Sequence, residues 1–183
     1  MPQQDRLRPP GTVGVVAQVL IGVKAVVEIV APLVTGIGRE GVDVLVRADQ
    51  VLSLAAALAF VVWFGCCRTN AEVFAPGRTP YGDGMAALAW FIPVFWWWGP
   101  WRIALGIRRA SGGTRGDVAL INAWWIAWVA RMVSLPLYRL LALYGGPNPP
   151  WFSALSAVAA ALCIAVISRI TAAQNAAARA AAG

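Results

Sequence analysis

The stretch WFIPVFWWWGPWRIALGIRRAS, residues 90–111, does most to decide what kind of protein this chain is. It holds five tryptophans and two prolines, and three arginines follow the last of these tryptophans. Tryptophan favours the boundary between water and lipid, because its ring is apolar and its N–H still needs a partner. Arginine suits the neighbouring headgroup zone, since an apolar stem carries the charged tip. The stretch therefore predicts a segment that lies at, or dips into, a bilayer surface.

The composition of the whole chain points the same way. Of its 183 residues, 60% are hydrophobic and 13% are charged, whereas a soluble domain is about half apolar and about a quarter charged. Because the apolar residues form long runs, we expect an integral membrane protein with one membrane domain. The net charge of +7 reflects 14 arginines and one lysine against eight acidic residues, and most of the basic residues lie at the ends of these runs. That placement is typical of membrane topology signals, and we expect no nucleic-acid partner.

The residue types exclude several kinds of chemistry. The chain has no histidine, which is the commonest general base and transition-metal ligand, so a Ser–His triad cannot form. Its three cysteines follow no metal-binding or disulfide spacing, and its eight acidic residues are scattered rather than grouped as a Mg²⁺ site requires. We therefore predict a protein that is not an enzyme and that uses no cofactor and no metal.

The apolar runs predict an all-α integral membrane bundle with four transmembrane helices. We place these helices at Thr12–Ile37, Gln50–Cys67, Val118–Tyr144 and Trp151–Ile167. The charged residues of 39–49 indicate an aqueous loop, with the start of the next helix as the alternative. A further run, Met85–Trp101, contains Pro93 and Pro100, which disfavour a straight helix. It is either a kinked fifth span or a proline-broken, Trp-rich re-entrant or interfacial helix.

Both ends of the chain differ from this membrane domain. Residues 1–11 are polar and proline-rich, and we predict a disordered tail there. Residues 12–170 are expected to form the single transmembrane domain. Residues 171–183 are rich in alanine, the best helix former, and are expected to form a tail that continues the last helix into water.

The arginines also predict orientation, because short cytoplasmic loops carry an excess of Lys and Arg. Four spans with cytoplasmic termini, and with 85–101 returning to the side it left, place ten arginines inside and three outside. The inside group is Arg6, Arg8, Arg68, Arg78, Arg102, Arg108, Arg109, Arg115, Arg169 and Arg179, and the outside group is Arg39, Arg47 and Arg139. A fifth span would divide them 8 to 5. We therefore predict four spans in a multi-pass protein of the bacterial plasma membrane, with both termini cytoplasmic.

Three charged residues lie well inside the apolar runs, where each charge costs about 2.5–3.5 kcal/mol. Lys24 and Glu28 are four residues apart, so they share a helical face and can pair. Arg131 lies near the middle of the run Val118–Tyr144, and Glu28 is the only acidic residue well inside such a run. We expect these two to make contact. The cluster either lines a path for an ion, a proton or a headgroup, or is an internal ion pair that fixes helix packing.

The Trp-rich stretch supplies a second candidate site. Guanidinium groups match phosphate bidentately, so its arginines either bind anionic lipid headgroups or act as a plain positive-inside anchor. The predicted headgroup or partner surface consists of Trp90, Trp96, Trp97, Trp98, Trp101, Arg102, Arg108 and Arg109. We interpret Trp124, Trp125 and Trp128 as packing or interfacial residues in preference to a cage for a cation.

Several of these residues, taken in order, resemble a known family. The pieces are Phe60–Trp63, Arg68–Ala71, Trp90–Pro93, Pro100 with Arg108–Ser111, and Trp124–Trp125. Over residues 12–170 the chain resembles the bacterial membrane proteins grouped as domain of unknown function 4328. The resemblance implies a membrane location and a helical fold, and it implies no activity. Two departures stand out: Val94–Trp98 replace a polar residue, often Asn, that follows WFIP in the family, and Arg109 replaces a tryptophan. A family site built on those groups would be lost here.

Two functional hypotheses follow. The first is a non-enzymatic interaction protein or lipid-associated scaffold of the cell envelope, with the Trp-rich stretch as its surface and membrane lipids or a membrane protein as partner. The alternative is a small homo-oligomeric transport or channel-like component whose path is lined by Lys24, Glu28 and Arg131. An enzyme acting on lipids ranks below both, because the chain has no histidine and no carboxylate cluster.

Overall fold

A computed structural model describes residues 7–31, 38–77, 79, 81–82, 84–142 and 149–182. Within these residues the chain is helical and contains no strand. The elements are α1 (Pro10–Val30), α2 (Arg39–Phe74), α3 (Met85–Leu88), the 3-10 helix η3 (Phe95–Trp97), α4 (Gly99–Ala110), α5 (Arg115–Ala142) and α6 (Pro150–Ala182). Helices α1, α2, α5 and α6 are long and apolar enough to cross a membrane. The prediction of an all-α membrane bundle with four transmembrane helices is confirmed.

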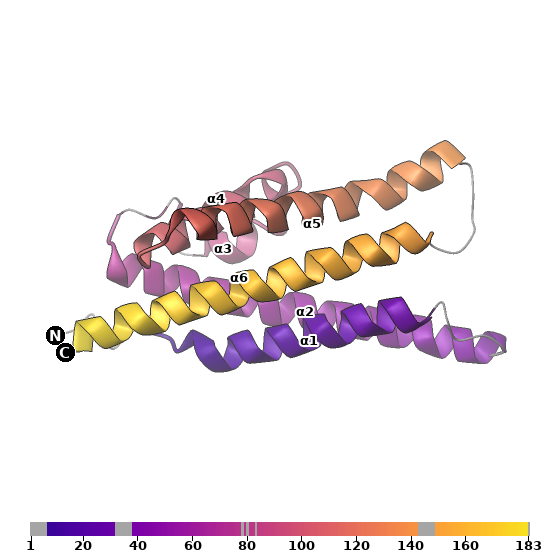
Figure 1. Cartoon of the computed structure of the whole chain (residues 1–183), viewed down its shortest axis with the longest axis horizontal. Helices are drawn as coiled ribbons and strands as arrows, with labels where there is room; N and C mark the ends of the chain where they lie inside the picture. The colour runs from indigo at the N-terminus through magenta and orange to yellow at the C-terminus, as the bar shows by residue number, and fades with distance from the viewer. Residues whose placement is uncertain are drawn as a thin grey trace.

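The four long helices run along the long axis of the molecule (Figure 1). Helix α1 packs against α2 on one side and against α6 on the other, and α6 in turn packs against α5. Helices α2 and α5 are joined mainly through the short helices. Helix α3 packs against α2, and α4 packs against both α2 and α5. The order around the bundle is therefore α2, α1, α6, α5, with the short helices closing part of the gap between α5 and α2.

The Trp-rich segment returns to the end of the bundle that it leaves. Helix α2 ends and α5 begins at the same end of the molecule (Figure 1). The Trp96 ring lies 6.1 Å from that of Trp128, which is thirteen residues after Arg115. At 1.5 Å per residue this is about 20 Å along α5, compared with a hydrocarbon core of about 30 Å. Because α5 has 28 residues, or about 42 Å, the segment reaches about halfway along α5 and then folds back, and we call it the re-entrant segment.

The two prolines explain why this segment is broken. Helix α3 ends at Leu88, and turns rather than a continuous helix run through Pro93 to η3. Pro100 is the second residue of α4, where a missing N–H costs nothing because the first amides of a helix have no partner within it.

Helix α2 extends further than its apolar run predicts. Helix α2 begins at Arg39 rather than at Gln50, so residues 39–49 are helical and the predicted loop is replaced by its alternative. Its 36 residues span about 54 Å, well beyond the hydrocarbon core. Glu40 in the first turn favours this start, because a negative charge stabilises a helix N-terminus. Helix α1 ends at Val30, and residues 32–37 of the predicted first span lie outside the described residues.

Both predicted tails contain residues that pack against the bundle. Helix α1 starts at Pro10, and just before it the backbone N–H and C=O of Arg8 bond to the Asn70 side chain at 2.8 and 2.7 Å. Residues 1–6 of that predicted tail lie outside the described residues. Helix α6 continues to Ala182, and Gln174 is buried where it donates to the Cys67 carbonyl at 2.7 Å. The alanine-rich segment is therefore a packed part of the last helix at least as far as Gln174.

Candidate functional site

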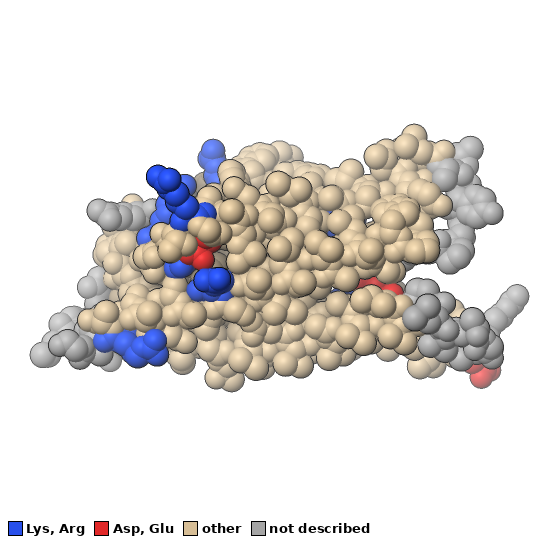
Figure 2. Space-filling model, viewed as in Figure 1, with Lys and Arg blue, Asp and Glu red and all other residues tan. Residues whose placement is uncertain are grey.

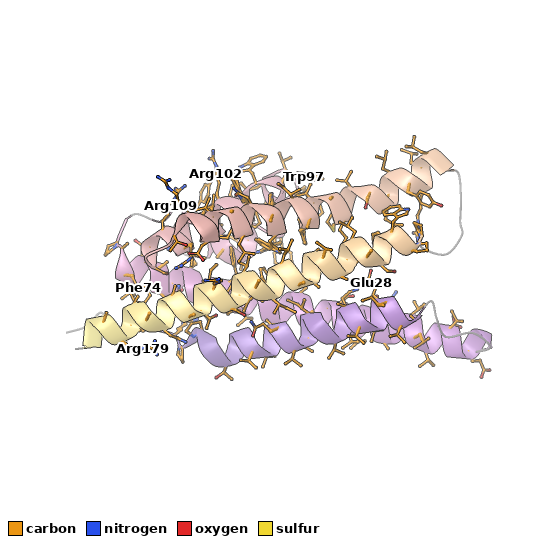
Figure 3. All side chains as sticks on the ribbon, in the orientation of Figure 1. Glu28, Phe74, Trp97, Arg102, Arg109 and Arg179 are labelled. Carbon is orange, nitrogen blue, oxygen red and sulfur yellow. The ribbon has the colours of Figure 1, made fainter. Side chains whose placement is uncertain are left out.

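The structure brings Lys24, Glu28 and Arg131 together in one cluster. Lys24 Nζ donates to Glu28 Oε2 at 2.7 Å, as their spacing of one helical turn allows. Arg131 Nη2 donates to the other carboxylate oxygen, Glu28 Oε1, at 3.2 Å. In Figure 3 Glu28 lies between α1 and α6, which is the helix that separates α1 from α5. Two cations from different helices thus share one carboxylate.

Three further residues, which the sequence did not single out, complete the cluster. Ser156 of α6 donates its hydroxyl to Glu28 Oε1 at 2.9 Å and accepts from Arg131 Nε at 2.8 Å. Asp49 of α2 lies 3.3 Å from Lys24 Nζ, and the Arg131 guanidinium stacks 5.2 Å from the centre of the Phe152 ring. Asp49 was missed because it precedes the apolar run, and Ser156 because one serine among alanines carries no distinctive pattern.

The cluster lies away from the middle of the bundle. Glu28 is two residues before the end of α1. Arg131 is sixteen residues after the start of α5, which is about 24 Å along that helix. The start of α5 is the end of the bundle where most of the visible arginines gather (Figure 2). The cluster therefore belongs to the opposite half of the bundle, near the end of α1 at Val30.

A cavity of about 370 Å³ adjoins the cluster. Its polar end is formed by Lys24, Glu28, Arg131 and Ser156, and its aromatic wall includes Trp90, Trp96, Trp124 and Trp128. Alanines of α2 and α6 are among the other lining residues, and their small side chains leave space in the cavity. A volume in this range, with apolar walls and a few polar groups, is typical of sites for small amphipathic ligands.

The predicted headgroup surface divides into an outward half and an inward half. Trp97 and Trp98 are 43% and 40% exposed, and Arg102 and Arg109 are also exposed. Figure 3 shows Trp97, Arg102 and Arg109 projecting from one side of the bundle around α4. Arg102 and Arg109 are seven residues apart, so they share one face of that helix. We call these four residues the outward Trp/Arg face.

The other four predicted surface residues, Trp90, Trp96, Trp101 and Arg108, turn inward. Trp90 packs edge-on against Phe60, with ring centres 5.4 Å apart, and Trp96 packs against Trp128. Trp101 Nε1 donates to Asn122 Oδ1 at 2.8 Å. Trp124 and Trp125 are buried in the same aromatic core.

Arg108 is buried at the end of α4 and pairs with an acidic residue of α5. It is 7% exposed, and its Nη2 lies 2.5 Å from Asp117 Oδ2. Asp117 also accepts the backbone N–H of Thr114 at 2.9 Å, which caps the start of α5. Arg108 lies in the last turn of α4 and Asp117 in the first turn of α5. Each charge is therefore opposite in sign to the helix end at which it lies, which stabilises both helices. Arg108 thus links α4 to α5 and does not reach the outward Trp/Arg face.

The Arg68–Ala71 motif holds together the end of α2. Arg68 Nη1 pairs with Glu72 Oε2 at 3.0 Å, and Arg68 also donates to the Tyr81 carbonyl. Asn70 is buried and donates to Gln174 Oε1 at 3.1 Å. The motif connects α2 to α6 and to the chain that leads into α3. In the described part of the chain, no three His, Cys, Asp or Glu side chains are close enough to hold a metal ion.

Comparisons with known proteins give one match. A family model described as Domain of unknown function (DUF4328) matches residues 40–143, more than half of the chain, which agrees with the resemblance seen in the sequence. No curated protein and no solved structure matches. The matched residues include Arg131, the re-entrant segment and the outward Trp/Arg face. Lys24, Glu28 and Ser156 lie outside them, so the polar end of the cavity is only partly built from the family region.

Proposed function

Because the chain belongs to the family described as a domain of unknown function (DUF4328), a description that names no activity, we propose a function from its geometry. The protein is a membrane protein, and we assign it the role of a non-enzymatic, lipid-associated scaffold of the cell envelope. Its working surface is the outward Trp/Arg face, which holds anionic headgroups and offers the same side to a membrane protein partner.

One observation supports this role above the others. Trp97, Trp98, Arg102 and Arg109 are exposed together on a re-entrant segment inserted between two long helices. Tryptophan sets the depth of a segment at the lipid boundary, and guanidinium groups bind phosphate. The packing contacts of α4 hold the two arginines in place from behind, through buried residues such as Ile103 and Ile107.

The orientation belongs to the same proposal. Arginines of the described residues gather at the end of the bundle where α2 ends and α5 begins (Figure 2). Helix α1 starts and α6 finishes at that end too (Figure 1). We assign this end to the cytoplasm, on the rule that short cytoplasmic loops are rich in Lys and Arg. The outward Trp/Arg face then meets the leaflet richer in anionic lipid.

Native mass spectrometry of the purified protein tests the headgroup contact. We compare phosphatidylglycerol with phosphatidylcholine of the same chains, for wild type and for the double variant Arg102→Gln/Arg109→Gln. Each arginine near a headgroup contributes about 1 kcal/mol, so the double variant should lose about thirty-fold in affinity for phosphatidylglycerol. The matched control is Arg169→Gln/Arg179→Gln, which removes two exposed arginines of α6. Equal losses in both double variants would mean that net charge alone attracts the lipid, and the proposal would fail.

The alternative function, a small oligomeric transport or channel-like component, is supported by the cavity that Lys24, Glu28 and Arg131 line. It ranks second because these three charges bond to one another, as an internal ion pair that fixes packing would. Ion or proton flux into proteoliposomes that is lost in Glu28→Gln, without loss of the folded protein, would reverse this order.

A further inference from the structure

The cavity beside the charge cluster has two chemically different ends, and they lie at different depths. Along α5 the lining residues follow in the order Trp124, Trp128 and Arg131. Trp124 and Arg131 are seven residues apart, or about 10 Å along the helix. The charged end is thus nearer the outer boundary of the bundle, and the aromatic end is nearer its middle. A lipid in that leaflet has the same order, with its headgroup outward and its chain toward the bilayer centre.

The polar end of the cavity has more hydrogen-bond donors than acceptors. Arg131 has five N–H groups, and the structure shows two of them in use, on Ser156 and Glu28. Its other N–H groups have no acceptor among the described residues. Trp90 also lines the cavity, and its buried Nε1 likewise has no acceptor in the described part of the chain. The residues that line this end carry two cations and one carboxylate, because the second carboxylate of the cluster, Asp49, lies 3.3 Å from Lys24 but does not line the cavity. An anionic acceptor group on Arg131 would complete the hydrogen bonds of the lining.

The cavity is open on one side. Ala57 of α2 and Phe91 of the re-entrant segment both line it, and both are exposed. They lie where α2 and α5 are held apart by the short helices instead of packing directly together. In a bilayer this side of a transmembrane helix faces lipid chains, so a chain can enter laterally.

We propose that this cavity binds one anionic lipid, with an acyl chain against the tryptophan wall and a carboxylate or phosphate group on Arg131 and Lys24. The volume of about 370 Å³ is large enough for such a chain segment. The aromatic wall alone would also suit a cation, but Lys24 and Arg131 repel one. A fatty acid and a phospholipid share the chemistry that the site recognises. The site is separate from the outward Trp/Arg face and does not depend on the scaffold role.

Quenching of tryptophan fluorescence by brominated lipids tests the proposal on the purified full-length protein in detergent. Four of the ten tryptophans line the cavity, so a brominated chain bound there should quench a minority of the tryptophan fluorescence. This quenching should saturate as the lipid concentration rises. We compare 9,10-dibromostearate with its methyl ester, which keeps the chain and removes the charge. The acid should bind at least about tenfold more tightly than the ester. Brominated phosphatidylglycerol is the second arm, and saturable quenching by it alone would identify a phospholipid as the occupant.

Two substitutions of alanines in α6 test the cavity without changing any residue of the charge cluster. Ala160→Phe places a ring in the cavity and should abolish saturable quenching, whereas Ala161→Phe changes the next residue, which is exposed on α6, and should leave it intact. Arg131→Gln should bring the acid down to the affinity of the ester. The surface variant Arg102→Gln/Arg109→Gln should leave binding of the acid unchanged, which separates this proposal from the scaffold role. Equal quenching by acid and ester, or equal quenching in Ala160→Phe and Ala161→Phe, would mean that the bromine quenches only from lipid around the protein. Either result would overturn the proposal.

Discussion

Replacing Glu28 by Gln should destabilise the bundle through the charge cluster. Glu28 accepts from Lys24, Arg131 and Ser156 at 2.7, 3.2 and 2.9 Å, and its side chain is 14% exposed. Glutamine keeps the shape but removes the one charge that both cations share. Breaking a buried ion pair typically costs about 3–5 kcal/mol. Because Lys24 keeps Asp49 as a partner, we expect a loss near the lower end of that range, about 3 kcal/mol.

Thermal unfolding in detergent, followed by circular dichroism, measures this loss. A chain of this size changes Tm by about 2–4 °C per kcal/mol, so Glu28→Gln should lower Tm by about 6–12 °C. Glu40→Gln is the matched control, since Glu40 is exposed in the first turn of α2, where its charge stabilises the helix start, and the variant should lose less than about 1 kcal/mol.

A double variant tests the contact itself. In Glu28→Gln/Arg131→Gln the second change removes the cation that the first leaves without its carboxylate, so the two losses should not add. A Tm for Glu28→Gln within about 2 °C of wild type, or losses that add in the double variant, would refute a packed and mutually dependent cluster.

Three further predictions concern packing elsewhere. Arg108→Gln should cost about 3 kcal/mol by stranding the buried Asp117, whereas Arg109→Gln, at an exposed neighbour, should cost less than about 0.5 kcal/mol in the same unfolding assay. Gly14→Leu should lower stability by about 1–3 kcal/mol, because even a Cβ there meets Thr171 Oγ1 and Trp63 at 3.2 Å, whereas Gly65→Ala has open space in α2 and should raise Tm slightly. Asn70→Ala should speed amide hydrogen exchange around Arg8, which it anchors, and equal exchange in both proteins would contradict that anchoring role.

The overall bundle could be predicted because its signal is compositional. Each of the four long helices contains an apolar run that can cross about 30 Å of hydrocarbon, and two prolines break the run between the second and third spans. The helix ends could not be read from those runs. Residues 39–49 are charged and still helical, because a helix that leaves the membrane can continue in water with its polar groups solvated.

The candidate sites were partly predictable. The Glu28–Arg131 contact could be anticipated, since a charge inside a membrane seeks an opposite charge and Glu28 is the only carboxylate well within an apolar run. The inward position of Trp90 and Arg108 could not be foreseen, because it depends on how the re-entrant segment folds back onto α2 and α5. Sequence spacing within one element does not reveal a partner such as Asp117, which lies across a turn in the next helix.

Cysteine accessibility in intact cells shows whether the chain on both sides of the re-entrant segment faces the cytoplasm. In a background without Cys66, Cys67 and Cys163, single cysteines replace Gly82 and Thr114, which are exposed on either side of the re-entrant segment, and Val44 near the start of α2. If the segment returns to the cytoplasmic side, a membrane-impermeant reagent should label Val44→Cys from outside, and should label Gly82→Cys and Thr114→Cys only after the cells are opened. Labelling of Gly82→Cys and Thr114→Cys from opposite sides would make the Trp-rich segment a fifth span and would rule out a four-span bundle with a re-entrant segment.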